Sequence, residues 1–217
     1  MIPLHLYWAR LLLENILAGN GVTMYRHSNG PVQWGPTFAS ITDCSGFINA
    51  LLEKSYNLMP KDWSNNNRAY VSTYYKAING EFTTKPKYFT KITNIYDARI
   101  GDFIVFRILP GTSGTDNTGH IMIINAKPIR IAPSNLSNPS NNNLHQWIIN
   151  IIDQSSAHGK LDSRKNGSNG LGTGYLKIYT EVNGNLRGYS WSDSANSKYI
   201  DSKTRPLVIA RLVELNI

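Results

Sequence analysis

The residues with the clearest capacity for chemistry lie in the stretch 42–47, TDCSGF, which contains the only cysteine of the chain. Cys44 stands directly before an apolar run with helical spacing, and Asp43 is a suitable N-cap for that helix. A cysteine in the first turn of a helix lies near unpaired backbone N–H groups and the positive end of the helix dipole, which stabilise its thiolate. We therefore interpret Cys44 as a nucleophile rather than as a small buried apolar residue.

A cysteine nucleophile needs a base that accepts and returns its proton, and His120 is our candidate. His120 begins an apolar stretch with strand character, after a segment of turn residues, so its side chain can face a cleft. The other histidines are less well placed, because they precede the cysteine helix, open a strand behind a polar loop or lie in a glycine-containing loop. They are His5, His27, His145 and His158.

The elements that would position these residues follow from hydrophobic periodicity. Helices are expected over 3–18, 44–56 and 65–78, and the last is followed by a connection over 85–94. Strands are expected over 100–108, 119–125, 146–152, 175–181, 186–191 and 206–212. Turn residues between the first two strands predict an antiparallel hairpin, and the polar stretches 128–143 and 154–174 are expected to be loops. Helices followed by a mainly antiparallel sheet predict an α+β fold with the N-terminal helices packed on the sheet.

Length and composition predict one domain over 1–217, since 217 residues with 41% hydrophobic content can bury one core. Within it we expect an N-terminal helix over 3–18, a core over 30–155, and a loop with C-terminal strands over 156–217. A single cysteine excludes an internal disulfide framework, and the histidines and carboxylates lack metal-ligand spacing, so we expect no metal and no cofactor.

The net charge of +8 and the isoelectric point near 9.5 favour an anionic partner. The basic residues are scattered and no basic arm is present, so we do not expect nucleic-acid binding. The apolar opening is interrupted by His5, Arg10 and Glu14 too early for a membrane span, and we expect no integral membrane segment. It also lacks a signal-peptide cleavage site, so export would require a signal already removed from this chain.

Three segments together resemble the NlpC-type cell-wall hydrolases, a papain-like family of bacterial cysteine peptidases. The segments are 43–47 (DCSGF), 101–106 (GDFIVF) and 120–124 (HIMII), which have the order of the cysteine helix, a Gly-Asp strand and the histidine strand of that family. The separation of Cys44 from His120, 76 residues (120 − 44), is longer than is usual there. The resemblance covers about 30–155 and implies a papain-like, NlpC-type fold.

The resemblance also implies a third polar residue at the end of the strand after the histidine strand. That position is Asp153, which would orient His120, and Gln154 and His158 are the substitutes that we consider. The residues expected to contact the substrate are Trp34, Ser45, Gly119 and His158. Many relatives carry a tyrosine ahead of the tryptophan, where this chain has Val32, so the bond that is cleaved could differ from the usual one.

The resemblance implies a thiol hydrolase that cleaves amide bonds in peptidoglycan stem peptides, acting as a monomer in the periplasm or after secretion. Two alternatives remain open. One is a secreted effector with the same Cys-His-Asp site that acts on a host protein or lipid as a deamidase, protease or acyltransferase. The other is a non-catalytic module that binds the wall.

Overall fold

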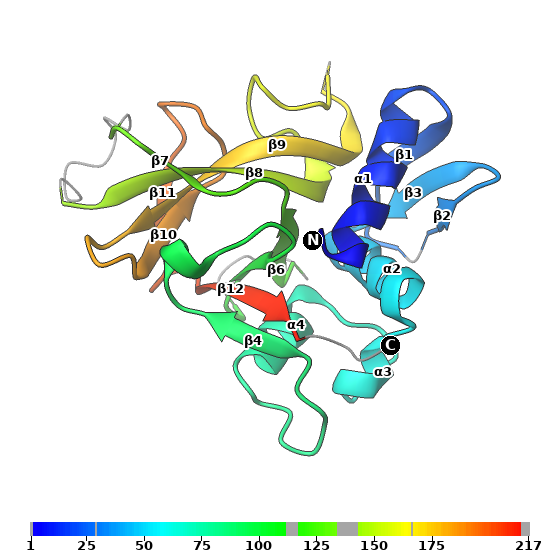
Figure 1. Cartoon of the computed structure of the whole chain (residues 1–217), viewed down its shortest axis with the longest axis horizontal. Coiled ribbons are helices and arrows are strands. Elements are labelled where there is room, and N and C mark those ends of the chain that lie inside the picture. Colours follow the sequence, from blue (N-terminus) through cyan, green and yellow to red (C-terminus); the bar gives the residue numbers. More distant parts are fainter. Residues whose placement is uncertain (1, 29, 112–116, 134–142, 166, 214–217) are drawn as a thin grey trace.

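The computed structural model describes residues 2–28, 30–111, 117–133, 143–165 and 167–213 (Figure 1). The helices are α1 (Leu4–Leu17), α2 (Cys44–Tyr56), α3 (Pro60–Trp63), α4 (Val71–Ile78) and the short 3-10 helix η1 (Ile95–Asp97). The strands are β1 (Gly21–Tyr25), β2 (Val32–Trp34), β3 (Phe38–Thr42), β4 (Phe89–Ile92), β5 (Phe103–Arg107), β6 (Gly119–Ile124), β7 (Ile129–Ile131), β8 (His145–Ser156), β9 (Asn169–Thr180), β10 (Leu186–Ser190), β11 (Tyr199–Asp201) and β12 (Leu207–Leu212).

A nine-stranded antiparallel sheet dominates the part of the chain that is described. Its strand order is β11-β10-β9-β8-β6-β5-β12-β4, and β7 pairs with β8 beside this path. The predicted hairpin is confirmed, since β5 and β6 pair antiparallel with Phe103 opposite Ile123. The turn that joins them includes 112–116, and the polar stretch after β7 includes 134–142, which lie outside the described residues. The α+β prediction is confirmed at the level of a large antiparallel sheet with a few helices.

A second, three-stranded sheet has the order β1-β3-β2, and sequence analysis did not predict it. β1 runs parallel to β3, with Tyr25 opposite Thr42, whereas β2 runs antiparallel to β3. Glycine, asparagine and proline are frequent here, and they weaken the strand pattern in the sequence. The sheet matters for the site because β3 leads directly into the cysteine helix.

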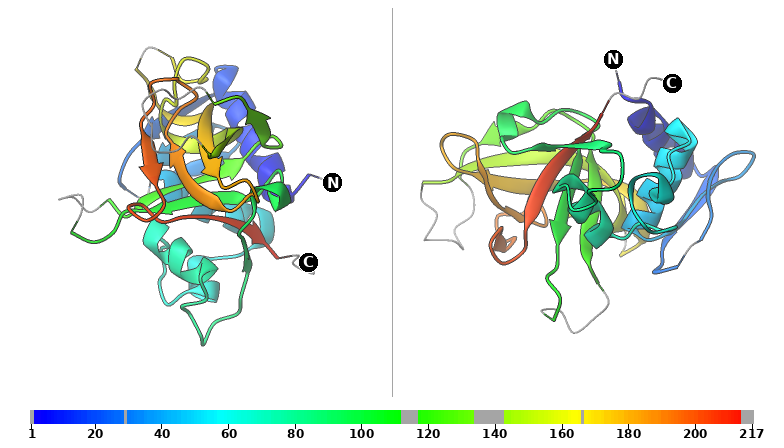
Figure 2. Two further views of the ribbon diagram at one scale, coloured as in Figure 1. Left: turned by 90° about the vertical axis from the view of Figure 1, so that its left-hand side faces the viewer. Right: turned by 90° about the horizontal axis from the view of Figure 1, so that it is seen from below.

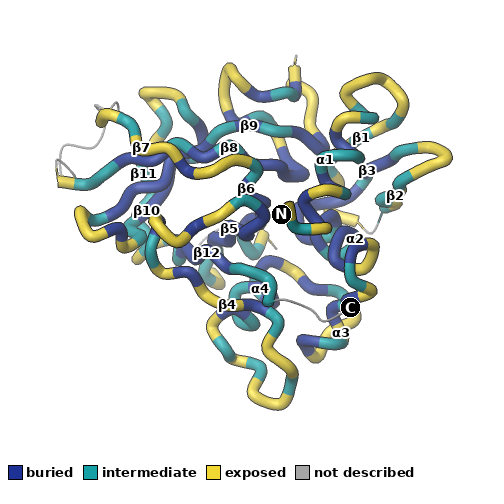
Figure 3. Tube along the Cα trace, viewed as in Figure 1, coloured by how far each residue is buried: buried dark blue, intermediate teal, exposed yellow. Residues whose placement is uncertain are grey.

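Helices α1 and α2 lie between the two sheets (Figure 2). One core cluster joins these helices and α4 to one face of the large sheet through residues such as Phe103 and Val105. Alternate residues of the same strand, Ile104 and Phe106, belong to a second cluster on the opposite face, which includes β9 and β10. The central strands are therefore buried on both faces, as the dark tube of β5 and β6 indicates (Figure 3).

Three predicted elements need correction. The helix expected over 65–78 begins only at Val71, because Arg68 turns toward Asp43 and Ser64 bonds back to the carbonyl of Pro60. The connection over 85–94 contains β4, and the loop expected over 154–174 is largely strand, since β8 extends to Ser156 and β9 begins at Asn169. No described helix combines the length and apolar character that crossing a bilayer requires.

Candidate active site

Cys44 is the first residue of α2, and the side chain of Asp43 fixes the turn in which it stands. Asp43 Oδ1 accepts hydrogen bonds from the Gly46 N–H at 2.7 Å and from the Ser45 hydroxyl at 2.9 Å. Its other oxygen pairs with Arg68 at 2.6 Å. Gly46 has no Cβ, and a Cβ there would collide with the Thr42 hydroxyl. The DCSG sequence is thus a local structure that caps the helix and presents the thiol.

The Cys44 side chain is 3% exposed, and it borders a cleft of about 630 Å³. The walls come from β1, the first turn of α2, the start of α4 and the entry to β6. The lining residues are Tyr25, His27, Asp43, Cys44, Ser45, Tyr70, Val71, Asn117, Thr118 and Gly119. The cleft is therefore rich in aromatic and polar groups.

His120 stands beside Cys44 at the entry to β6 and contacts both Cys44 and Asp153. Gly119 precedes it with φ +129, and a Cβ at that position would collide with the carbonyl of Phe106. Only glycine fits this close approach of the two strands. His120 Nε2 lies 2.6 Å from Asp153 Oδ2, which leaves its second ring nitrogen for the thiol. Burial lowers the pKa of His120, but Cys44 and Asp153 raise it more strongly, to about 10.

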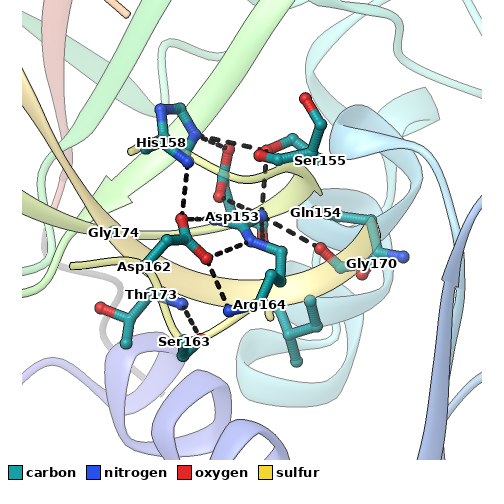
Figure 4. Close-up of polar contacts among 12 residues, drawn as sticks. Asp153, Gln154, Ser155, His158, Asp162, Ser163, Arg164, Gly170, Thr173 and Gly174 are labelled. Atoms are coloured by element: carbon teal, nitrogen blue, oxygen red, sulfur yellow. Dashed lines mark hydrogen bonds and ion pairs between the residues drawn. The ribbon is translucent and has the colours of Figure 1, made fainter. Parts of the chain in front are cut away.

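Asp153 is fully buried and is the centre of a network of charged groups (Figure 4). Its Oδ2 is hydrogen-bonded to His120 and also to His158, whose Nε2 lies 2.8 Å away. Its Oδ1 lies 2.9 Å from Arg164 Nη1, an ion pair that is not aligned as a hydrogen bond. Burial favours the neutral acid, but the charges of His158 and Arg164 and the histidine hydrogen bonds hold the pKa of Asp153 well below its usual range. Asp153 is therefore a carboxylate at neutral pH.

The segment between β8 and β9 folds back against β9 and brings Arg164 and Asp162 under Asp153 (Figure 4). Arg164 donates two hydrogen bonds to the Asp162 carboxylate, at 2.8 and 2.7 Å. Both side chains lie against β9 at Gly172 and Gly174, where any Cβ would collide with them. The glycines that suggested a flexible loop are thus strand residues that make room for a buried ion pair.

The structure brings together the three predicted catalytic residues, Cys44, His120 and Asp153. Gln154, a substitute for the third position, points elsewhere: its amide contacts Ser40 and the carbonyl of Met24. Of the predicted substrate-contacting residues, Ser45 and Gly119 line the cleft.

Two of the residues predicted to contact the substrate, Trp34 and His158, are not among those that line this cleft. Trp34 lines a separate depression with Val32 and donates a hydrogen bond to the carbonyl of Trp8 at 2.8 Å. His158 is 1% exposed and lies behind Asp153, away from the cleft lining. Trp34 is partly buried against Trp8, and His158 is covered by Trp191.

Sequence reasoning missed two aromatic residues of the cleft, Tyr25 and Tyr70. Tyr25 lies on β1 directly opposite Thr42, two residues before the cysteine. Burial, followed by the charges of Cys44, Asp43 and Asp153, raises the pKa of Tyr25. The one sequence signal for Tyr25 was that a tyrosine often precedes the cysteine in the family that the chain resembles. Tyr25, however, lies outside the stretch around Val32 where the resemblance places that tyrosine.

Comparison with known proteins identifies a relative of this chain. The chain is 45% identical over 227 aligned residues to the uncharacterized protein R653 of Acanthamoeba polyphaga mimivirus, and the match covers 97% of this chain and 96% of that protein. The two proteins belong to one family. No family model matches the chain, and no solved structure gives a significant match.

One group of three side chains in this protein has the composition of a metal site. Among the described residues, His120, Asp153 and His158 bring one ligand atom each to within 4.8 Å of one another. The two histidine nitrogens, however, lie at hydrogen-bond distances of 2.6 and 2.8 Å from the same oxygen. Ligands of a tetrahedral zinc ion are about 3.3 Å apart, and Arg164 already pairs with this carboxylate. We therefore interpret the group as a hydrogen-bonded network.

Proposed function

We propose that this protein is a cysteine hydrolase of amide bonds, with peptidoglycan stem peptides as its substrate. One observation carries the proposal: His120 contacts the sole cysteine on one side and a buried carboxylate on the other. This is the arrangement in which a histidine maintains a thiolate and returns its proton to a leaving group. The cysteine helix packed on an antiparallel sheet that carries the histidine supports the NlpC-type, papain-like interpretation of the fold.

The reaction would proceed through a thioester. The Cys44 thiolate attacks the amide carbonyl, a C–S bond forms, and the carbonyl oxygen becomes an oxyanion. His120 then donates its proton to the nitrogen as the C–N bond breaks, and the amine leaves. In the second half, His120 takes a proton from water, the resulting hydroxide attacks the thioester, and the C–S bond breaks to restore the thiolate. Asp153 keeps the His120 ring in place and stabilises the imidazolium.

The oxyanion needs donors that are not already used within the helix. The Gly46 and Phe47 N–H groups bond to Asp43, so the Cys44 N–H is the backbone donor that we assign. The Tyr25 hydroxyl is our second donor, because Tyr25 lines the same cleft, and burial together with the charge of Cys44 raises its pKa and keeps the hydroxyl protonated. Tyr25 would take the place of the tyrosine that many NlpC-type hydrolases carry at the position of Val32.

The test is mass spectrometry of purified sacculi and soluble muropeptides after incubation with the protein. We expect new amide-cleaved fragments with the wild type and none with Cys44→Ala or His120→Gln. His145→Gln is the matched control, since it changes a histidine at the opposite end of β8 from Asp153. An active Cys44→Ala protein would overturn the proposal.

The same experiment separates the alternatives. Absence of fragments together with an unusually reactive Cys44 would keep the hydrolase and move its substrate to a host protein or lipid. A thiol that is alkylated no faster than free cysteine, whose pKa is about 8.5, would instead indicate a non-catalytic wall-binding module. Cleavage of stem peptides would agree with the expected action in the periplasm or after secretion, which stays a prediction.

A further inference from the structure

His158 is a buried histidine to which the proposed reaction gives no task. It lies five residues after Asp153 and shares the carboxylate oxygen Oδ2 with His120. Its ring stacks on Trp191 with a centroid distance of 4.1 Å, and the backbone carbonyl of Trp191 lies 2.6 Å from its Nδ1. Both ring nitrogens therefore have close polar partners in a site that is closed to solvent.

Every partner of the His158 ring is a hydrogen-bond acceptor. The Trp191 carbonyl accepts at Nδ1, and the Asp153 carboxylate accepts at Nε2. The Ser155 oxygen, 3.3 Å from Nε2, gives its own proton to the carbonyl of Ser156 and accepts from Arg164. A neutral imidazole would point one lone pair at one of these acceptors. All of these hydrogen bonds are made only when each ring nitrogen carries a proton.

The charges around His158 balance only if it is positive. The groups that face it are Asp153 on β8, Asp162 and Arg164 on the segment before β9, and the His120 ring on β6 at 6.4 Å. The Asp43–Arg68 pair beside Cys44 is balanced in itself. Apart from that pair, the Cys44 thiolate, Asp153 and Asp162 are three anions, and the His120 and His158 imidazoliums and Arg164 are three cations. Without the His158 charge, a buried site would carry one excess negative charge, which disfavours the thiolate.

We propose that His158, protonated on both ring nitrogens, is a positioning residue that holds Asp153 in place and supplies the positive charge that balances the Cys44 thiolate. This inference rests on the proposed cysteine chemistry. His158 contacts neither the thiol nor the cleft, so it acts through Asp153 and His120. Loss of one unit charge at such distances shifts the titration of a neighbouring group by roughly one pH unit or more.

The first measurement is the nitrogen NMR spectrum of the histidine side chains in the wild-type protein at pH 7, with His158 assigned from the signals that disappear in His158→Gln. We expect the two ring nitrogens of His158 to show the shifts of an imidazolium. A single protonated nitrogen would overturn the proposal. This measurement needs no substrate, and the His158→Gln variant serves only to assign the signals.

The second measurement is the pH dependence of Cys44 alkylation by iodoacetamide in wild type, His158→Gln and Lys160→Gln. The glutamine amide can still donate to Asp153 but carries no charge, whereas Lys160→Gln removes one charge from an exposed position of the same loop. We expect His158→Gln to move the acid limb of the profile up by about one pH unit, roughly a tenfold loss of rate below the midpoint, with Lys160→Gln unchanged.

The outcomes are distinguishable. A lower plateau rate with an unmoved limb in His158→Gln would show a merely structural role and contradict the proposal, as would an equal shift in Lys160→Gln. A wild-type thiol that reacts like free cysteine would refute the proposed hydrolase itself, and that result comes from the wild-type protein alone. A shift of the acid limb in His158→Gln, with no shift in Lys160→Gln, supports both the role of His158 and the proposed cysteine hydrolase.

Discussion

Arg164→Met should be the most destabilising single change in the charged network, because it removes the arginine that pairs with two buried carboxylates. Arg164 is 3% exposed at its side chain, and the Asp153 and Asp162 side chains that it pairs with are 0% exposed. Removing one partner of a buried ion pair costs about 3–5 kcal/mol. Methionine keeps most of the volume, so lost packing contributes little.

The expected shift in melting temperature follows from the size of the chain. An unfolding entropy of about 2.1 cal/mol/K per residue over 217 residues gives about 0.46 kcal/mol/K. The loss of about 3–5 kcal/mol then lowers the midpoint by about 7–11 °C in thermal denaturation followed by circular dichroism. The matched control is Arg187→Met, which removes an arginine from a solvent-exposed pair with Glu181 and should leave the midpoint unchanged.

The pH dependence gives a second check on the same variant. The pKa of Asp153 is depressed in the folded protein, so the stability that it contributes is present above its unfolded pKa and is lost as the pH falls through the folded value. Without Arg164 that pKa moves up, because the carboxylate has lost a cation. The difference in midpoint between wild type and Arg164→Met should therefore be largest near neutral pH and narrow in acid. A small, pH-independent difference equal to that of Arg187→Met would refute this reasoning.

Three further predictions concern the same site. Because the folded pKa of His120 is raised to about 10, its stabilising contribution is complete below about pH 6.5 and is lost as the pH rises through about 10. In urea titrations at several pH values, we expect the wild type to lose stability in this alkaline range and His120→Gln to lack that loss. Gly174→Ala places a methyl group against Asp162 and should lower the free energy of unfolding by about 1–3 kcal/mol in the same titrations. Amide cleavage and Cys44 alkylation should be unaffected by EDTA; loss of either, restored by added metal, would show that a metal ion occupies the group around Asp153.

Local signals explain which parts of the molecule were predictable. The α2 helix, its Asp43 cap and the β5–β6 hairpin each follow from residues that are near one another in the sequence, and the structure confirms them. The placement of Asp153 beside His120 depended on the resemblance, which supplied the order of the strands. Sequence periodicity alone could not bring together two residues 33 positions apart.

The parts that were missed depend on contacts between distant segments. Tyr25 reaches the cleft because β1 pairs parallel with β3, and no pattern within β1 announces that partner. His158 has the sequence surroundings of an exposed loop, yet the segment that contains it is anchored by Arg164 and covered by Trp191. Burial of such a polar segment is stable only when all its charges are paired, and pairing cannot be read from composition.

The glycines of β9 illustrate how this ambiguity arises and what resolves it. Gly172 and Gly174 are weak strand formers, and isolated from their neighbours they indicate a flexible loop. In the fold they occupy a strand face onto which Arg164 and Asp162 pack, and any larger residue would push that ion pair away from Asp153. Gly172 and Gly174, which weaken the strand pattern in the sequence, are therefore required to hold Arg164 beside Asp153. A glycine-rich stretch that follows a candidate catalytic carboxylate, with an arginine and an aspartate nearby, is better interpreted as a packing surface for a buried charge network than as a hinge.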